Sequence, residues 1–568
     1  MDRSQIRELL SEPERSLGIL NDEIARLQAM LDDLKNQRDA LGEIIYEHYR
    51  LLTPIRRMPD DILSEIFLWC LPDKHNAVMS ASEAPLLLGR VCSRWRYVAY
   101  RTPRLWATLH IPLPIPPSPN ILLSNQSLQF QQVSEAFEEK YQNHCQAIRE
   151  WFARSGSRPL SISFNPKESF PSTTSNEQIR KYFDLILEYS HRWRDLEISI
   201  TAAEFSTFLA SISSNAVPLL ESLHLKFFRR NMQPDAWQCS GLLNAPKLRV
   251  LQVSQFPCRP STLNVDWSRL THLIIADSGA TLRNRNLNLT EAQRIFVQCK
   301  HLVHCSIDIM DVPDATCDSS EPISLPHLVS LDVVDGAKGL STLFRNLYVP
   351  ALRSISYHTT LWPTTRTQQS PLFVLLSGTN GQITSFSTDI HLFTYQEVLE
   401  IFNSMPLLKS FSNRRSRFGH SREQSRMRGC PIYKDVMKAV LDLLSPSPDG
   451  RSCLCPRLLN IDLSDSLYLK EEDALHFLRA RLGASDIQMS VGCSSFETMD
   501  VARLTSVSIT FTLERANYLD IQKALEPYVR EGLKLNLSFP HPRKISPGII
   551  NPLSGLPKYQ ASDILWSF

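Results

Sequence analysis

The chain has 568 residues, and its 61 Lys and Arg residues nearly balance 59 Asp and Glu residues. This balance excludes an overall field that would draw the protein to nucleic acid or an anionic membrane, so it favours a protein partner. A single domain usually has about 100 to 200 residues, so the length requires several domains or a repeat architecture that grows by stacking. The charged start MDRSQIRELL and the lack of long apolar runs predict no signal peptide and no membrane span, and hence a cytoplasmic or nuclear protein.

Residues 1–53 carry a heptad pattern that predicts a coiled-coil helix, with possible self-association through residues 17–52. Its seam positions alternate spacings of three and four: Leu17, Leu20, Ile24, Leu27, Leu31, Leu34, Arg38, Leu41, Ile45, His48 and Leu52. Arg38 and His48 interrupt the seam, and Gly18 and Gly42 each cost the helix about 1 kcal/mol relative to alanine. The alternative is one long helix that packs back on its own domain.

The stretch MPDDILSEIF, residues 58–67, predicts a helix that begins near Pro59. Proline is tolerated in the first turn, and the two aspartates that follow it lie at the positive end of the helix dipole. An apolar stripe follows along one face of this helix, formed by Ile62, Leu63, Ile66, Phe67 and Cys70. Spacing alone favours a stripe that faces its own core, and a second protein is the alternative cover.

Residues 54–111 form the predicted helical unit around this stripe. A second helix is expected through PLLLGRVCSRWRYVAY, where Leu88, Val91, Trp95 and Val98 repeat the three-four spacing, and TPRLWATLHI closes the unit. The segment IPLPIPPSP then opens a proline-rich linker over residues 112–131, because proline disfavours helix and favours an extended spacer. We expect this spacer to set the distance between the helical unit and the rest of the chain.

Residues 132–560 repeat a short strand signature separated by helix-like segments such as EAQRIFVQC and TYQEVLEIFNSM. The core position of each L-x-x-L copy falls at Leu223, Leu251, Leu273, Cys305, Leu331, Ile355, Phe386 and Phe411. The steps lie between 22 residues (Leu251 to Leu273) and 32 residues (Leu273 to Cys305), which overlaps the leucine-rich-repeat period of roughly 20 to 29. The asparagine of regular repeats is mostly missing, so the pattern predicts an irregular α/β solenoid with a concave binding surface.

Signatures of catalysis are lacking in the sequence. It has no GxGxxG or GxxxxGK[ST] loop, no HExxH, no GxSxG and no CxxC pair, so we expect no enzyme, no cofactor and no metal site. Cys453 and Cys455 favour structural thiols over metal ligands, and His301 and His304 favour surface or packing roles. The arginine-rich segment 414–428 favours a solvated insertion, with an acidic partner or a nuclear address as the alternative.

Residues 54–111 resemble an F-box, in the F-box-like form of large fungal families. The resemblance rests on PIRRMPDDILSEIF, VCSRWRYVA and TPRLW in this order, with Met58 in place of the usual leading leucine. The coil, spacer and irregular leucine-rich solenoid also resemble the layout of those proteins. The combined fold class is thus a coiled-coil helix, a small all-α F-box and an irregular leucine-rich-repeat-like α/β solenoid.

The resemblance implies a substrate adaptor of a Skp-cullin-F-box ubiquitin ligase without catalysis of its own. The F-box would dock on a Skp-type linker protein, and through it on a cullin, while the solenoid binds an unknown target. Residues implied in docking or in holding the docking helices are Pro59, Ile62, Leu63, Ile66, Phe67, Val91, Cys92, Trp95 and Trp106. Two alternatives are a scaffold that binds the linker protein outside a ligase, and a coiled-coil scaffold without linker protein. The second predicts tolerance to polar substitution at Ile66 and Phe67.

Overall fold

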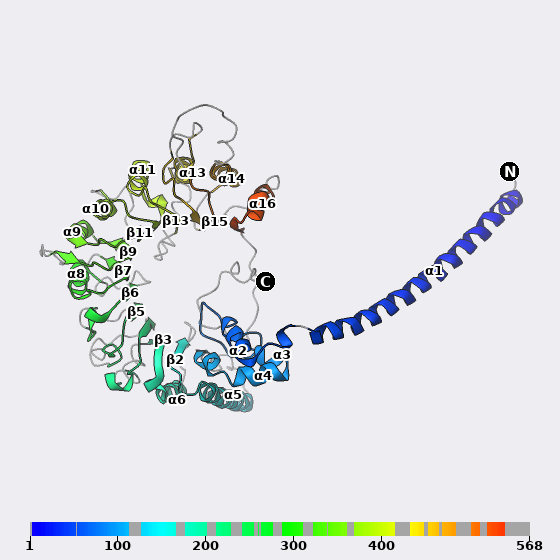
Figure 1. Cartoon of the computed structure of the whole chain (residues 1–568), viewed down its shortest axis with the longest axis horizontal. Coiled ribbons are helices and arrows are strands. Elements are labelled where there is room, and N and C mark those ends of the chain that lie inside the picture. Colours follow the sequence, from blue (N-terminus) through cyan, green and yellow to red (C-terminus); the bar gives the residue numbers. More distant parts are fainter. Residues whose placement is uncertain are drawn as a thin grey trace.

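The computed structural model describes the chain in segments that carry one long helix, a small helical unit and a large sheet. These segments are residues 3–52, 54–112, 127–165, 176–201, 209, 212–228, 241–254, 260, 263–276, 287–310, 322–337, 339–359, 369–414, 432–447, 453–464, 469–483, 501–511 and 520–539. Figure 1 shows the sheet and its helices as an open arc, from which the long helix projects. The statements below concern these residues.

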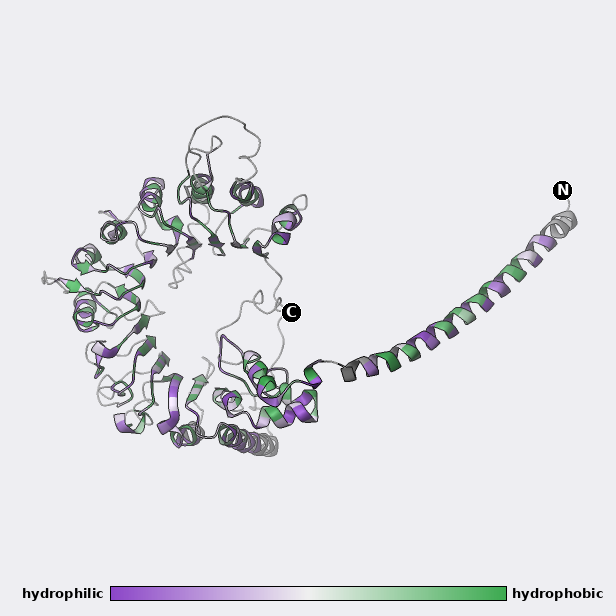
Figure 2. Ribbon diagram, viewed as in Figure 1, coloured by the Kyte–Doolittle hydropathy of each residue, from purple (hydrophilic) through white to green (hydrophobic). Residues whose placement is uncertain are grey.

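Helix α1 (Arg3–Leu52) confirms the helix predicted for the N-terminal heptads. Its apolar seam side chains from Leu17 to Ile45 are 51% to 60% exposed, and Figure 2 shows hydrophobic residues recurring along its length. The helix therefore does not pack back on its own domain, and that alternative is wrong. The exposed seam remains available, and its pairing with a second copy stays a prediction.

The helical unit, residues 54–106, consists of short helices joined by loops. Its elements are η1 (Pro54–Arg56), α2 (Asp60–Trp69), α3 (Leu88–Val91), α4 (Ser93–Tyr100) and η2 (Pro103–Trp106). Helix α2 begins directly after Pro59, with Asp60 and Asp61 in its first turn, which confirms the predicted helix start. The second predicted helix is divided at Cys92, whose extended backbone separates α3 from α4.

Fourteen parallel strands form one continuous sheet in the described segments. They are β1 (Thr108–Pro112), β2 (Leu160–Asn165), β3 (Trp193–Thr201), β4 (Ser222–Phe228), β5 (Val250–Ser254), β6 (His272–Ala276), β7 (His304–Met310), β9 (Ser330–Gly336), β11 (Ser354–Thr359), β12 (Ser385–Thr388), β13 (Ser410–Asn413), β14 (Asn460–Leu463), β15 (Ser506–Thr510) and β16 (Lys534–Ser538). Two short strands, β8 (Ile323–Ser324) and β10 (Leu347–Tyr348), pair separately. The chain is therefore a mixed α/β protein with the form of a solenoid.

Helices cover the outer face of this sheet, and the strands line the inside of the arc (Figure 1). The helices are α5 (Ser127–Arg154), α6 (Asn176–Leu187), α8 (Leu289–Gln298), α9 (Leu340–Arg345), α10 (Pro371–Ser377), α11 (Tyr395–Asn403), α13 (Ile432–Leu444), α14 (Glu471–Leu482) and α16 (Ile521–Arg530). Local capping fixes several starts. The Asn288 side chain accepts the Glu291 amide, and Thr394 and Glu397 form a capping box. These two starts confirm the helices predicted at those segments.

The strand register confirms the predicted repeat alignment. Leu223, Leu251, Leu273, Cys305, Leu331, Ile355, Phe386 and Phe411 pair with one another in this order across adjacent strands. All eight are buried, and the Phe386 and Phe411 rings stack with centroids 6.3 Å apart. Each repeat thus contributes one side chain to a continuous core that no single repeat could bury alone.

The helical unit is joined directly to the sheet. Strand β1, which was expected to close the unit, pairs in parallel with β2, so the sheet begins at Thr108. The Ala77 carbonyl of the unit accepts the His110 amide of β1 at 2.8 Å. The ring centroids of Trp106 and of Trp151 on α5 lie 4.7 Å apart. Residues 113–126 lie outside the described residues, and α5 begins at Ser127. Contact through β1 and α5, rather than a spacer, sets the distance between unit and solenoid.

Candidate functional site

The apolar residues of α2 divide into an inner and an outer stripe. Leu63 and Phe67, four residues apart, have no exposed surface. Ile62, Ile66 and Trp69, at i, i+4 and i+7, follow the next face of the helix. Ile62 is 48% exposed, Ile66 is half-buried, and Trp69 is 88% exposed. The single broad stripe expected from spacing is thus partly core and partly open surface.

The inner stripe builds the core of the helical unit. The Phe67 ring lies 4.8 Å from the ring of Trp95, which is half-buried on α4. Trp106 is fully buried, donates its indole N–H to the Ala99 carbonyl at 2.9 Å, and contacts Tyr100 edge-on. These aromatic contacts hold the helices together, so Leu63, Phe67 and Trp106 have no surface to offer a partner.

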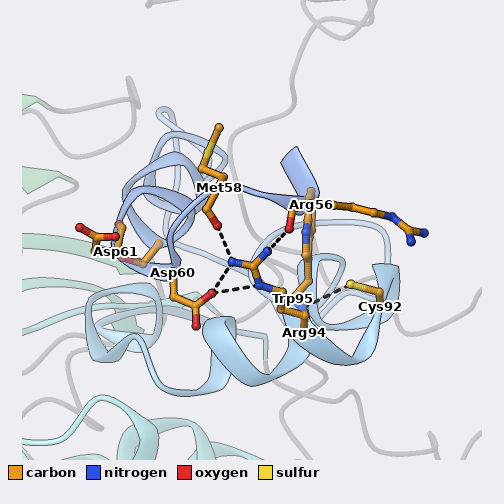
Figure 3. A network of polar contacts seen from close by, with 8 residues as sticks. Arg56, Met58, Asp60, Asp61, Cys92, Arg94 and Trp95 are labelled. Carbon is orange, nitrogen blue, oxygen red and sulfur yellow. Dashed lines mark hydrogen bonds and ion pairs between the residues drawn. The ribbon is translucent and has the colours of Figure 1, made fainter. Parts of the chain in front are cut away.

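Arg94 of α4 fixes the start of α2 (Figure 3). Its guanidinium donates to the Asp60 carboxylate, with Nη2 at 2.6 Å from Oδ1, and to the backbone carbonyl of Arg56 at 2.6 Å. It also donates to the Met58 carbonyl. One side chain thereby bonds Arg56, Met58 and Asp60, at alternate positions of the η1–α2 connection, because the planar guanidinium presents several donors at once.

A second ion pair and an N-cap complete the frame of the unit. Arg104 of η2 bonds Glu65 of α2 at 2.7 Å. The exposed Cys92 caps α4 by accepting the Trp95 amide at its sulfur, 3.4 Å away. Contacts at the start, the middle and the inner face of α2 hold this helix in place. Its outer stripe is therefore presented by a rigid helix.

The nine residues predicted for docking therefore separate into three sets by their exposure. Leu63, Phe67 and Trp106 are buried, and Trp95 and Ile66 are half-buried, whereas Pro59, Ile62, Val91 and Cys92 are exposed. Val91 on α3 is 55% exposed, and Leu87 just before it is 43% exposed. Sequence reasoning missed Trp69, Leu87 and Arg94. The i+7 spacing of Trp69 from Ile62 was the signal for the first of them.

On the inner face of the solenoid, mostly polar and half-buried side chains alternate with the buried core positions, and His110, Ser163 and Ser306 are themselves buried. One column of neighbouring residues along the strands reads His110, Ser163, Glu197, His224, Gln252, Ile274, Ser306, Asp332, Ser356, Ser387, Ser412, Asp462, Ser508 and Asn536. Cross-strand bonds order it, such as Ser306 to Asp332 at 2.9 Å and Ser412 to Asp462 at 3.1 Å. This surface is rich in hydroxyls and carboxylates, which suits recognition of a polar partner.

Burial perturbs two titratable groups of this face. Desolvation raises the pKa of Glu197, and nearby Lys226 partly opposes that shift. Desolvation lowers the pKa of His224, and the Asp195 charge partly opposes it. Both groups are therefore biased toward their neutral forms, as burial in a low-dielectric setting requires.

The other residues that the sequence singled out, two cysteines, two histidines and an arginine-rich segment, lie in packing or surface positions where the structure describes them. Burial raises the pKa of the Cys455 thiol to about 12, and its sulfur lies 3.8 Å from the Met405 carbonyl. His301 is exposed, and His304 is half-buried beside His272. Of the arginine-rich segment, only Arg414 is described, and it pairs with Asp462 at 3.2 Å. The rest, residues 415–428, lies outside the described residues.

In the described part of the chain, no group of three or more His, Cys, Asp or Glu side chains is placed to hold a metal ion. Across the same residues, none of the helices combines the length and apolar character that a membrane crossing needs. No protein-family model and no curated protein matches the chain.

Proposed function

We propose that the helical unit is an F-box-like module that docks on a Skp-type linker protein, while the solenoid holds a target protein. The observation that carries this proposal is the outer stripe of α2. Ile62, Ile66 and Trp69 stand on a helix whose other face already has a complete core, and Trp69 is 88% exposed. A large aromatic side chain on a rigid helix is the kind of residue that dominates helix-in-groove interfaces.

The attachment of the unit to the solenoid supports an adaptor role. Because β1 continues the sheet and Trp106 packs on Trp151, a partner held on α2 would keep a fixed position relative to a target held on the inner face. In a Skp-cullin-F-box ligase, this arrangement would present the target to the ubiquitin-transfer machinery through the linker protein and cullin. The chain itself would supply binding and orientation, without catalysis.

A second function is favoured by one specific observation. The seam of α1 exposes its apolar side chains between Leu17 and Ile45 to solvent, which suits a coiled-coil dimer. In this alternative the chain is a self-associating scaffold whose solenoid binds partners without a linker protein. The two functions differ at α2, because only the adaptor needs the outer stripe free for another chain.

Co-purification of the full-length chain with a Skp-type linker protein tests the proposal. The parent is compared with an Ile62→Asp, Trp69→Asp variant, and Tyr395→Asp serves as control because Tyr395 is an exposed aromatic residue, 53% accessible, on solenoid helix α11. The adaptor predicts that the parent and the control bind and that the α2 variant does not. A folded parent that fails to bind leaves the scaffold as the better account. A ubiquitination assay with the assembled complex then separates a ligase adaptor from a linker-bound scaffold.

A further inference from the structure

A surface groove of about 730 Å³ crosses four consecutive repeats of the solenoid at the turns that precede β5, β6, β7 and β9. Five of its lining side chains are basic: Lys247, Arg249, Arg269, His301 and His327. Pro246, Val303 and Val329 add apolar surface, and Val329 is 41% exposed. The groove is therefore basic and partly hydrophobic.

The repeat itself places four of these basic side chains in one row. Lys247, Arg269, His301 and His327 each come directly before a buried core leucine, namely Leu248, Leu270, Leu302 and Leu328. The strands that follow are hydrogen-bonded neighbours, so equivalent positions in adjacent repeats lie about 4.8 Å apart. Residues up to 80 positions apart in sequence (247 to 327) thus form one ladder. The ladder ends at Ala351, the equivalent residue of the next repeat.

The positive charge of the groove is only partly compensated. Arg269 pairs with Asp266 at 2.8 Å and donates to the Pro246 carbonyl. The His301 and His327 rings stack on each other, 6.1 Å apart. Among the described residues, the exposed side chains of Lys247 and Arg249 make neither an ion pair nor a hydrogen bond. Within the described part of the chain, these two charges therefore face the groove without a compensating partner.

We propose that this groove binds an acidic, extended peptide segment that carries at least one apolar side chain. Carboxylates would pair with Lys247 and Arg249, and the apolar side chain would cover Val303 and Val329. No Phe, Tyr or Trp ring is among the residues that line the groove, and the rings of His301 and His327 already stack on each other, so the surface favours a peptide over single-stranded RNA. This site would give the proposed target-binding solenoid one ligand of a defined chemical class. It rests on the proposed function only for the biological role of that ligand.

Fluorescence anisotropy with full-length protein tests this site. The probe is a labelled peptide in which Asp and Glu alternate with Leu, and its matched control replaces the acids by Asn and Gln. Reversing one charge within a close pair changes affinity by at least about tenfold, so Arg249→Glu is expected to weaken binding by that factor. Lys409→Glu provides a control at the equivalent repeat position outside the groove and should stay within about twofold.

Each other outcome overturns the proposal. It fails if the parent does not bind the acidic peptide, if the Asn and Gln peptide binds equally well, or if Arg249→Glu and Lys409→Glu weaken binding alike. Tighter binding of a single-stranded RNA or of anionic vesicles would assign the groove to another ligand class. The Ile62→Asp, Trp69→Asp variant should keep peptide binding, so failure of the docking proposal is distinguishable from failure of this one.

Discussion

Two neighbouring aromatic residues of α2 should respond to substitution in opposite ways. Phe67 is fully buried and its ring lies 4.8 Å from Trp95, whereas Trp69, two residues later, is 88% exposed. Truncation of a buried phenylalanine to alanine costs about 3 to 5 kcal/mol, because it removes buried apolar surface and leaves a cavity. Trp69→Ala removes almost no buried surface, so its effect on stability should stay within about 0.5 kcal/mol.

Native-state hydrogen exchange of α2 in the full-length chain measures this difference locally. A loss of about 3 kcal/mol accelerates exchange through unfolding of the helical unit by about a hundredfold, since about 1.4 kcal/mol corresponds to tenfold. Phe67→Ala should therefore lose most protection of α2, and Trp69→Ala should keep it. Equal protection in both variants, or greater loss in Trp69→Ala, would refute the division of α2 into an inner and an outer stripe.

Three further predictions concern other parts of the chain. Arg94→Ala should destabilise the helical unit by about 1 to 2 kcal/mol in urea denaturation, because its bonds to Asp60 and two backbone carbonyls are lost; an unchanged midpoint would contradict the network. Leu31→Glu, at a seam position that is 52% exposed, should lower the sedimentation mass of a self-associating chain, and an unchanged oligomer would exclude pairing through α1. Burial lowers the pKa of His144 to about 4, so the native state resists protonation and stability should fall between about pH 6.5 and 4, by about 3 kcal/mol. Thermal melts of His144→Gln should lose part of this pH dependence, and the same slope in both proteins would rule out His144 as its source.

The solenoid could be predicted because its signal is local and repeated. Each core position, from Leu223 to Phe411, lies in the same short pattern, and strand pairing places these residues side by side. The start of α2 was equally predictable, since a proline followed by two acidic residues is typical of a helix N-terminus. Local chemistry was sufficient in both cases.

The parts that sequence did not predict depend on contacts between distant segments. At 3.6 residues per turn, Ile62 and Leu63 point about 100° apart, so both fall within one broad apolar stripe. Packing against Trp95 and η2 decides which side of that stripe is covered. The fusion of the unit to the sheet required β1 to pair with β2, which a proline-rich segment had obscured. The basic groove likewise combines four repeats, so the sequence around His301 alone could not indicate that Lys247 and Arg249 line the same groove.

Calorimetric titration of a purified Skp-type linker protein onto the full-length chain measures docking through the outer stripe of α2. We expect saturable one-to-one binding by the parent and by Tyr395→Ala, and a loss of at least about 2 kcal/mol, roughly thirtyfold in affinity, for Trp69→Ala with its fold retained. Equal affinity of the parent and Trp69→Ala, or no binding by a folded parent, would contradict docking through the outer stripe of α2.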